Sequence, residues 1–406
     1  MAALIIAGSG PVGMRAAAEI ARRLPQLPCL LYGEEPCEPY DRSRLSAFVA
    51  GELSREALRA TDLADAPQVG RHYGCAVRSI DRAGRCITDA AGQVRPYSKL
   101  ILATGARGHY PKLPGMHLEG VHPFRDLGDA ERLIARRMRS RRTLVLGGGL
   151  LGIEAARAMR RHRTEVTLVE HAPRLMPRQL DSHAAALLQR RLEQEGIQVV
   201  LGSGVRLLFG DTRVAGARLM NGEDLCCDTI VLATGTRPRT ELALQAGLPV
   251  GAGIRVDDRL RTADPDIFAI GECAEHRGTV YRMAAPGLEQ AATVAAVIAG
   301  EDVRYTGSGA GLSATLCGLP VFSSGRVGED ELGPDDDTKA FMGREGYCKV
   351  VLTRGRMAGA LAVGTGFDVA RLQRAVRDGW RPAPWQRWRF LMTGQLWAEA
   401  PQAVRI

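Results

Sequence analysis

Residues 4–13 read Leu-Ile-Ile-Ala-Gly-Ser-Gly-Pro-Val-Gly and run directly into a segment of small residues. An apolar run that ends in Gly-x-Gly-x-x-Gly and continues in this way predicts a strand, a tight turn and the start of a helix. Gly8 permits the turn, Gly10 lets the backbone approach a pyrophosphate, and Gly13 lets the helix pack on the strand. The helix that begins near Pro11 then offers unpaired backbone N–H groups to the phosphates.

The same arrangement recurs later in the chain. A second apolar run, Cys29–Gly33, leads to Glu34 and Glu35, where a carboxylate can accept hydrogen bonds from ribose hydroxyls. Residues 146–152 read Leu-Gly-Gly-Gly-Leu-Leu-Gly, and Glu170 closes the strand that follows. One glycine pattern is weak evidence, since such turns often hold no ligand. Two copies with matching carboxylates predict two nucleotide sites.

Composition limits the class of protein. The chain has 406 residues, of which 45% are hydrophobic and 24% charged, as in a globular chain of two or three domains. The first strand begins at residue 3 or 4, so we expect no signal peptide. No apolar run approaches the ~18 residues needed to cross a bilayer. We therefore expect a cytoplasmic protein without a transmembrane segment.

The charge and the cysteines exclude further classes. The net charge is +9, and the isoelectric point is near 9.3. No nucleic-acid recognition motif accompanies this charge, so we expect no nucleic-acid partner, and an acidic protein partner is the functional interpretation. The nine cysteines form no Cys-x-x-Cys pair, which argues against a metal site, an iron–sulfur cluster or a disulfide framework. We expect buried free thiols and no metal.

The order of elements predicts an α/β fold. Residues 76–102 alternate and turn as in a β-meander, and the strand that follows closes on Thr104-Gly105. A second module begins at residue 143 and closes on a repeated Ala-Thr-Gly that ends at Gly235. The chain then returns to the first module with a buried strand that ends at Gly271-Glu272, and an alanine-rich helix opens near Pro286.

These elements predict two Rossmann-like dinucleotide-binding modules, the second inserted into the first, and a small C-terminal α+β domain. The expected domains are 1–110 with 241–308, 111–240, 309–366 and an Arg/Trp-rich helical tail at 367–406. The tail holds all four tryptophans of the chain, at Trp380, Trp385, Trp388 and Trp397. Packing on its own domain and docking of a partner are both open interpretations.

Three segments carry a family resemblance: Pro39-Tyr40-Asp41-Arg42 with Leu45-Ser46, Leu-Met-Pro-Arg-Gln-Leu-Asp at 175–181, and Ala-Ile-Gly-Glu-Cys-Ala-Glu-His-Arg-Gly at 269–278. Over roughly residues 2–366 the chain resembles the two-dinucleotide-fold flavoprotein reductases, which bind FAD in one module and a nicotinamide nucleotide in the other. Within that superfamily it is most similar to the flavoprotein portion of NADH-dependent assimilatory nitrite reductase large subunits. Rubredoxin reductases are near relatives.

The departures from the superfamily are informative. The Cys-x-x-x-x-Cys pair of the thiol-disulfide members is absent, and Ala47 stands where NADH peroxidases and oxidases have a cysteine. We therefore expect no cysteine in turnover. The cysteine array that would bind a cluster or sirohaem is also absent, so the resemblance implies that this chain does not reduce nitrite alone.

The resemblance implies specific site residues. The FAD contacts would be Gly8, Gly10, Pro11, Gly13, Glu34, Glu35, Arg42, Thr104, Gly105, Gly271, Glu272 and Pro286. The NADH contacts would be Gly147, Gly149, Gly152 and Glu170, with Glu154 near the nicotinamide and Gly235 as a further cofactor contact. NADPH is expected to bind less well because Glu170 would repel a 2′-phosphate, although His171 and Arg174 lie close by in sequence. No side chain is expected to act as a nucleophile or general acid.

The resulting hypothesis is an FAD-dependent NADH oxidoreductase that passes electrons from NADH through FAD to a separate acidic redox protein. Rubredoxin, ferredoxin or a nitrate or nitrite assimilation partner would be the acceptor. The alternative is a nucleotide-binding flavoprotein subunit with a redox-sensing or interaction role and little turnover. A homodimer is compatible with either hypothesis.

Overall fold

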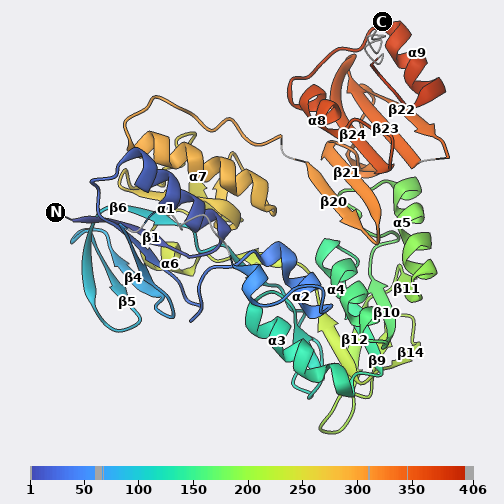
Figure 1. Ribbon diagram of the computed structural model, residues 1–406, viewed down its shortest axis with the longest axis horizontal. Helices are drawn as coiled ribbons and strands as arrows, with labels where there is room; N and C mark the ends of the chain where they lie inside the picture. The colour runs from blue at the N-terminus through green and yellow to red at the C-terminus, as the bar shows by residue number, and fades with distance from the viewer. Residues whose placement is uncertain (1, 60–65, 67, 310, 345, 398–406) are drawn as a thin grey trace, which may run out of the picture. The chain divides into compact units, whose positions relative to one another are not determined.

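The computed structural model describes residues 2–59, 66, 68–309, 311–344 and 346–397, so the end of the predicted tail, 398–406, lies outside it (Figure 1). The chain divides into two compact units. The first comprises Met1–His109, Arg125–Glu131 and Gly235–Ser308, and the second comprises Tyr110–Phe124, Arg132–Thr234 and Gly309–Ile406. Throughout the described ranges, no helix has both the length and the apolar character required to cross a membrane.

A parallel sheet with an antiparallel extension forms the centre of the first unit. Its strand order is β3-β2-β1-β6-β5-β4, with β18 also paired to β6. The strands β3, β2, β1, β6 and β18 run parallel, and β4, β5 and the start of β6 form the predicted meander. The bounds of these strands are β1 Ala3–Ala7, β2 Cys29–Tyr32, β3 Val69–His72, β4 Val77–Asp81, β5 Cys86–Asp89, β6 Val94–Leu102 and β18 Ile267–Ala269.

Two helices from distant parts of the chain cover one face of this sheet. α1 (Pro11–Arg23) and α7 (Ala284–Ile298) lie side by side in Figure 1. Their apolar faces, with Ile20 and Val294, are buried against sheet residues such as Ile6. Burial of this surface drives the association of segments that are more than 260 positions apart, which makes the first module discontinuous.

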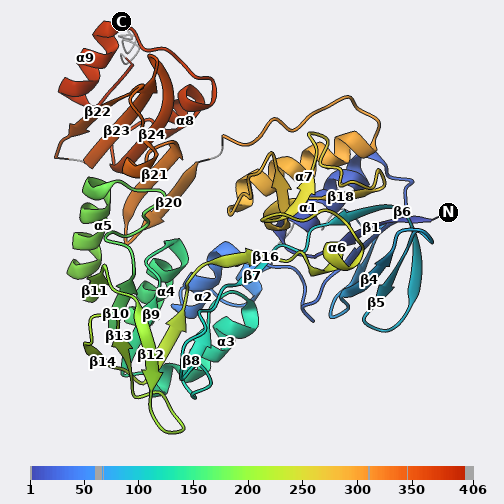
Figure 2. The same cartoon turned by 180° about the vertical axis from the view of Figure 1, so that it is seen from behind.

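Smaller elements complete the first unit. The antiparallel pair β7 and β16 is visible from behind in Figure 2. The bounds are η1 Arg42–Arg44, α2 Leu45–Val49, η2 Glu56–Leu58, β7 Ala106–Gly108, β16 Thr236–Pro238, α6 Glu241–Gln245, β17 Ile254–Val256, η4 Gly271–Cys273 and β19 Ala274–His276.

The second unit contains a parallel sheet, with strand order β11-β10-β9-β15-β8, and a three-stranded antiparallel sheet, β12-β13-β14. The bounds are β8 Val121–Pro123, η3 Arg137–Arg139, β9 Arg142–Leu146, α4 Leu150–Arg161, β10 Glu165–Glu170, α5 Ser182–Gln194, β11 Ile197–Leu201, β12 Val205–Phe209, β13 Gly216–Leu219, β14 Asp224–Cys226 and β15 Thr229–Leu232. The helix α3, Leu127–Arg136, belongs to the first unit as far as Glu131 and to the second unit from Arg132.

An antiparallel sheet, β20-β21-β24-β23-β22, follows in the same unit, and the helices α8 and α9 pack on it. Phe390 of α9 and Leu372 of α8 are buried in its core. Both helices lie within the segment that was expected to form a helical tail. The bounds are β20 Leu312–Leu316, β21 Leu319–Gly325, η5 Glu329–Glu331, β22 Asp336–Met342, β23 Gly346–Thr353, β24 Arg356–Gly364, α8 Val369–Arg377 and α9 Pro384–Thr393.

A buried ion pair joins the start of α5 to the C-terminal sheet of the second unit. Asp181 caps α5 by accepting a hydrogen bond from the Ala184 N–H at 3.0 Å, and it also accepts one from the Tyr347 hydroxyl at 2.7 Å. The Lys349 ammonium lies 3.2 Å from the same carboxylate and donates to the Val327 carbonyl at 3.1 Å. Burial and the Asp181 carboxylate both raise the pKa of Tyr347, so its hydroxyl remains a donor.

The cost of removing one partner can be predicted. Lys349→Met should lower the free energy of unfolding by about 3 kcal/mol, because it leaves a buried carboxylate without its cation. Lys339→Met is the matched control. Lys339 lies on the neighbouring strand β22 with 30% of its side chain exposed and pairs with Asp337 at 2.6 Å, and its loss should cost less than about 0.5 kcal/mol. Urea unfolding followed by circular dichroism measures both, and equal losses would contradict the assignment.

Candidate functional site

Four loops of the first unit leave the sheet at the carboxyl ends of neighbouring parallel strands. The register places Ala7 beside Tyr32 and Leu102, and Leu102 beside Ala269. Ligands of open parallel sheets bind outside these ends. The loops contain most of the predicted FAD contacts, at residues 8–13, 33–35, 103–105 and 270–273.

The three glycines of the first turn are not equivalent. A Cβ at Gly8 would lie 2.1 Å from the Ala103 carbonyl oxygen, and one at Gly13 would lie 1.9 Å from the Gly8 carbonyl oxygen. The fold itself therefore requires glycine at both positions. A Cβ at Gly10 would meet no heavy atom of the described residues within 4 Å. Packing does not explain this glycine, whereas a phosphate lying against it would.

The second unit repeats this division. A Cβ at Gly147 would lie 2.4 Å from the Ala233 carbonyl oxygen, and one at Gly152 would lie 1.8 Å from the Gly147 carbonyl oxygen. Around Gly149, by contrast, the described part of the chain has no heavy atom within 4 Å of such a Cβ. In each unit, packing between described residues explains the first and last glycine of the turn but not the middle one. A ligand lying against the turn would explain the middle glycine. The predicted residue Glu154 lies in α4, directly after the second turn.

Three of the predicted FAD-binding segments meet at Val12. Gly271, with φ +77°, would place a Cβ 3.3 Å from Val12, and a Cβ at Gly287 of α7 would lie 2.5 Å from it. Gln290, one turn farther along α7, accepts a hydrogen bond from the Gly271 N–H at 2.7 Å and is fully buried. These contacts fix the glycine turn, the loop that contains Glu272 and the start of α7 relative to one another. Pro286 is buried at the same end of α7.

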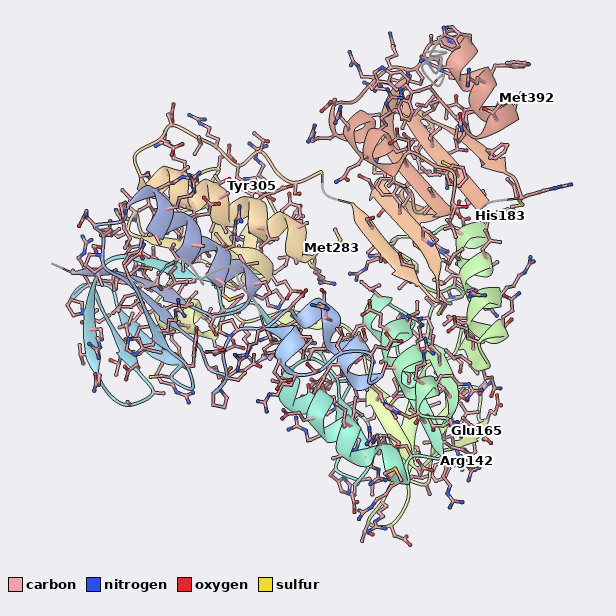
Figure 3. The ribbon with its side chains drawn as sticks, in the orientation of Figure 1. Arg142, Glu165, His183, Met283, Tyr305 and Met392 are labelled. Atoms are coloured by element: carbon pink, nitrogen blue, oxygen red, sulfur yellow. The ribbon has the colours of Figure 1, made fainter. Side chains whose placement is uncertain are left out.

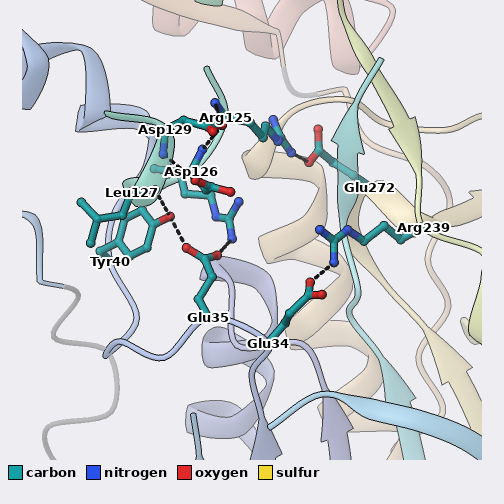
Figure 4. A network of polar contacts seen from close by, with 10 residues as sticks. Glu34, Glu35, Tyr40, Arg125, Asp126, Leu127, Asp129, Arg239 and Glu272 are labelled. Carbon is teal, nitrogen blue, oxygen red and sulfur yellow. Dashed lines mark hydrogen bonds and ion pairs between the residues drawn. The ribbon is translucent and has the colours of Figure 1, made fainter. Parts of the chain in front are cut away.

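The two adjacent glutamates predicted for the ribose differ in their surroundings. Glu34 has 55% of its side chain exposed and forms an ion pair with Arg239. Glu35 accepts a hydrogen bond from the Tyr40 hydroxyl at 2.6 Å and forms an ion pair with the predicted residue Arg42 (Figure 4). A small hollow bordered by Ser9, Gly10 and Glu35 brings Glu35 to the glycine turn. The geometry therefore favours Glu35 for the ribose.

Two residues of this region were not predicted. Arg125, just before α3, forms an ion pair with Glu272 (Figure 4), and its backbone N–H donates to Asp129 at 2.9 Å. The Tyr40 hydroxyl accepts a hydrogen bond from the Leu127 N–H at 2.8 Å. Burial raises the pKa of Tyr40, so it remains an uncharged donor toward Glu35. The sequence separation of 147 residues between Arg125 and Glu272 left no local signal for this pair.

The remaining predicted contacts of the first unit lie near the end of β6. The Thr104 hydroxyl donates to the Arg239 carbonyl at 2.9 Å. Gly105 and Gly235 have φ values of +67° and +102°, which explains glycine at both positions. Cys273 follows Glu272 and is fully buried, and burial raises the pKa of its thiol. All nine cysteines lie in the described residues and are free thiols.

In the second unit, Glu170 faces the glycine turn from the end of β10. It is 5% exposed. One carboxylate oxygen accepts a hydrogen bond from the Gly148 N–H at 2.6 Å, and the other accepts from the Ala172 N–H at 2.8 Å. The His171 Nδ1 lies 2.7 Å from that second oxygen. These donors hold the carboxylate in place at the turn.

Arg174 is occupied by other contacts. Its guanidinium donates to the carbonyl oxygens of Leu180, at 3.2 Å, and Pro177, at 3.3 Å. It also lies 3.3 Å from the Asp330 carboxylate, and only 12% of its side chain is exposed. Arg174 is thus close to Glu170 in sequence but directed toward the C-terminal sheet of the second unit.

Comparison with known proteins identifies the family. Residues 2–296 match the model of the pyridine nucleotide-disulphide oxidoreductases. The chain belongs to this family. It is therefore a flavin-dependent oxidoreductase, and the predicted resemblance and fold class are confirmed. The individual site residues remain predictions.

Individual relatives support the same assignment. A nitrite reductase [NAD(P)H] from Bacillus subtilis (strain 168) is 35% identical over 91% of this chain and 46% of its own length. A rubredoxin-NAD(+) reductase from Pseudomonas putida is 34% identical over 73% of this chain and 79% of its own. The solved ferredoxin reductase of the CYP199A2 system from Rhodopseudomonas palustris superposes with a TM-score of 0.82 at 28% identity, covering 89% and 91% of the two chains. This chain spans about half the length of the nitrite reductase it matches.

The two open glycine positions generate a prediction. Gly10→Val should fold normally, because φ of Gly10 is −69° and no described atom blocks the side chain. It should weaken FAD binding by about a hundredfold or more, because the valine side chain would occupy the pyrophosphate position. Gly149→Val, with φ −80°, should keep FAD and lose NADH binding. Flavin and nucleotide titrations measure the two affinities, and each variant is the control for the other. Unchanged FAD affinity in Gly10→Val would remove the basis for the site.

Proposed function

We propose that this chain is an FAD-dependent NADH oxidoreductase that passes electrons to a separate acidic redox protein. Rubredoxin, ferredoxin or a nitrate or nitrite assimilation partner is the proposed acceptor. The observation that supports this function is the pair of turns in which Gly10 and Gly149 adjoin space that no described residue fills. When bound, FAD supplies the hydride-accepting and electron-donating chemistry.

The chain's own residues would hold and orient the two cofactors. In the first unit, Glu35 would accept hydrogen bonds from a ribose, and Glu272 lies on a loop that a hydrogen bond to Gln290 holds. In the second unit, Glu170 would take the ribose of NADH. The relatives named as rubredoxin and ferredoxin reductases support a protein acceptor. The chain covers only 46% of the nitrite reductase, so the substrate of that enzyme is not carried over.

A low-turnover sensor or interaction subunit is the competing hypothesis, and rapid kinetics separates the two. NADH mixed anaerobically with the FAD-loaded protein should bleach the flavin absorbance within milliseconds to seconds, and rubredoxin or ferredoxin should then be reduced catalytically. Slow bleaching, or fast bleaching without reduction of any protein acceptor, would favour the sensor. The bleaching step itself would still report NADH oxidation.

The surroundings of Glu170 support a proposed preference for NADH over NADPH. A 2′-phosphate would approach the buried Glu170 carboxylate, and the guanidinium of nearby Arg174 is engaged by carbonyls and Asp330. Repulsion of this kind costs several kcal/mol.

We expect kcat/KM for NADH to exceed that for NADPH on the order of a hundredfold, about 3 kcal/mol. Glu170→Ala with His171→Arg should narrow or invert this ratio by removing the repulsion and adding a cation. Steady-state kinetics with a small dye acceptor measures it. Equal values for the two nucleotides in the unmodified protein would refute the preference.

An acidic acceptor would be attracted by the net charge of +9. Reduction of rubredoxin or ferredoxin should slow roughly tenfold between about 10 mM and 150 mM salt, while reduction of a neutral dye should barely change. The dye reaction is the control for salt effects on NADH oxidation. A protein acceptor whose reduction is independent of salt would exclude electrostatic steering.

A further inference from the structure

Helix α9 exposes four large apolar side chains. Trp385, Trp388, Leu391 and Met392 are 57%, 67%, 43% and 63% exposed, respectively. At 100° per residue they fall within an arc of about 120°, opposite the buried Phe390. Together they form a continuous surface strip, which we call the α9 ridge. Figure 3 labels Met392 on this helix.

The ridge stands on a well-anchored helix. Phe390 is 1% exposed in the core beneath it. The Gln386 side chain accepts a hydrogen bond from the Ala383 N–H at 2.8 Å at the start of the helix. Gly394 ends it with φ +72°, where a Cβ would lie 2.5 Å from Phe341. The exposed side chains are therefore presented on a fixed backbone, which lowers the entropy that a partner must overcome.

The surroundings of the ridge are basic. Residues 367–397 contain six arginines against two aspartates, a balance of +4, and α9 itself contains Arg387 and Arg389 but no acidic residue. By the same helical geometry these two arginines lie on opposite edges of the ridge. Arg387 and Arg381 approach Gly355 together, and they donate to the carbonyls of Pro382 and Arg354, which carry no compensating charge.

We propose that the α9 ridge is a docking surface for an acidic protein partner, whose apolar groove receives the two tryptophans and whose carboxylates meet the flanking arginines. Tryptophan and arginine are the residues that most often dominate binding energy in interfaces, and a basic amphipathic helix fits a groove with an acidic rim. A second copy of this chain is disfavoured because it would bring two +4 segments together. Identifying the partner as the electron acceptor rests on the proposed function.

The test uses the 406-residue chain loaded with FAD and two probes, a rubredoxin and a [2Fe–2S] ferredoxin. Trp385→Ala with Trp388→Ala should weaken binding of the probe that the unmodified protein binds at least tenfold. The KM for that probe should rise in parallel, and the rate of dye reduction should not change. Trp385→Phe with Trp388→Phe should restore most of the binding. The matched control is Met220→Ala with Leu244→Ala, at 66% and 63% exposure on other elements, and it should change nothing. Arg387→Gln with Arg389→Gln should reduce the salt dependence of binding.

The outcomes distinguish this inference from the function. If the tryptophan variant binds and reduces the probe normally, the ridge is not the docking surface and the proposed function stands. If the unmodified protein binds a probe through the ridge but does not reduce it, the docking surface stands and the proposed acceptor fails. If neither probe binds, the inference is overturned. Ridge-dependent self-association, or tighter ridge-dependent binding to phosphatidylglycerol vesicles or to an oligothymidylate, also overturns it.

Discussion

The first unit depends on the contact of Val12 with the backbone at Gly271 and Gly287. Val12 lies in the first turn of α1, Gly271 in the loop after β18, and Gly287 in α7, so three distant segments touch at one side chain. Neither glycine could carry a Cβ without displacing Val12 or its neighbours. The hydrogen bond from the Gly271 N–H to Gln290 then sets the rotation of the loop. Glu272 follows Gly271 directly. The position of this candidate cofactor contact is therefore determined by contacts between protein residues.

The sequence predicted the parts of this arrangement that are local. The glycine turns, the strands that precede them and the meander have short repeating patterns, and these correspond to β1, β6, β9 and β4–β6. The pairs that assemble the site are long-range: Arg125 with Glu272 and Gln290 with Gly271. Periodicity contains no information about which distant element packs against which, so these pairs could not be predicted. The sequence left Glu34 and Glu35 as equal candidates for another reason, since adjacent residues share one sequence context and differ only in the direction of the side chain.

The tail illustrates the same limit. Its four tryptophans were expected either to pack or to dock as a group, but they divide. Trp380 and Trp397 lie with ring centroids 5.4 Å apart against the C-terminal core, while Trp385 and Trp388 are exposed on α9. Phe390 on one side of α9 is buried, and the residues on the opposite side are exposed. The sequence alone did not predict which residues lie on which side, because this assignment requires the bounds of α9.

The segment after Glu170 has a consequence for engineering. Arg174 contacts Asp330, and Ser182 donates to Glu329 through both its backbone N–H, at 3.0 Å, and its hydroxyl, at 2.8 Å. These hydrogen bonds from Ser182 lower the pKa of Glu329, so the carboxylate stays charged well into the acidic range. Residues 171–182 are therefore half of a two-part module whose other half is the turn at 329–331. If residues 171–182 alone were replaced by the loop of a relative to change the nucleotide preference, Glu329 and Asp330 would lose their present partners. The two segments should therefore be exchanged together.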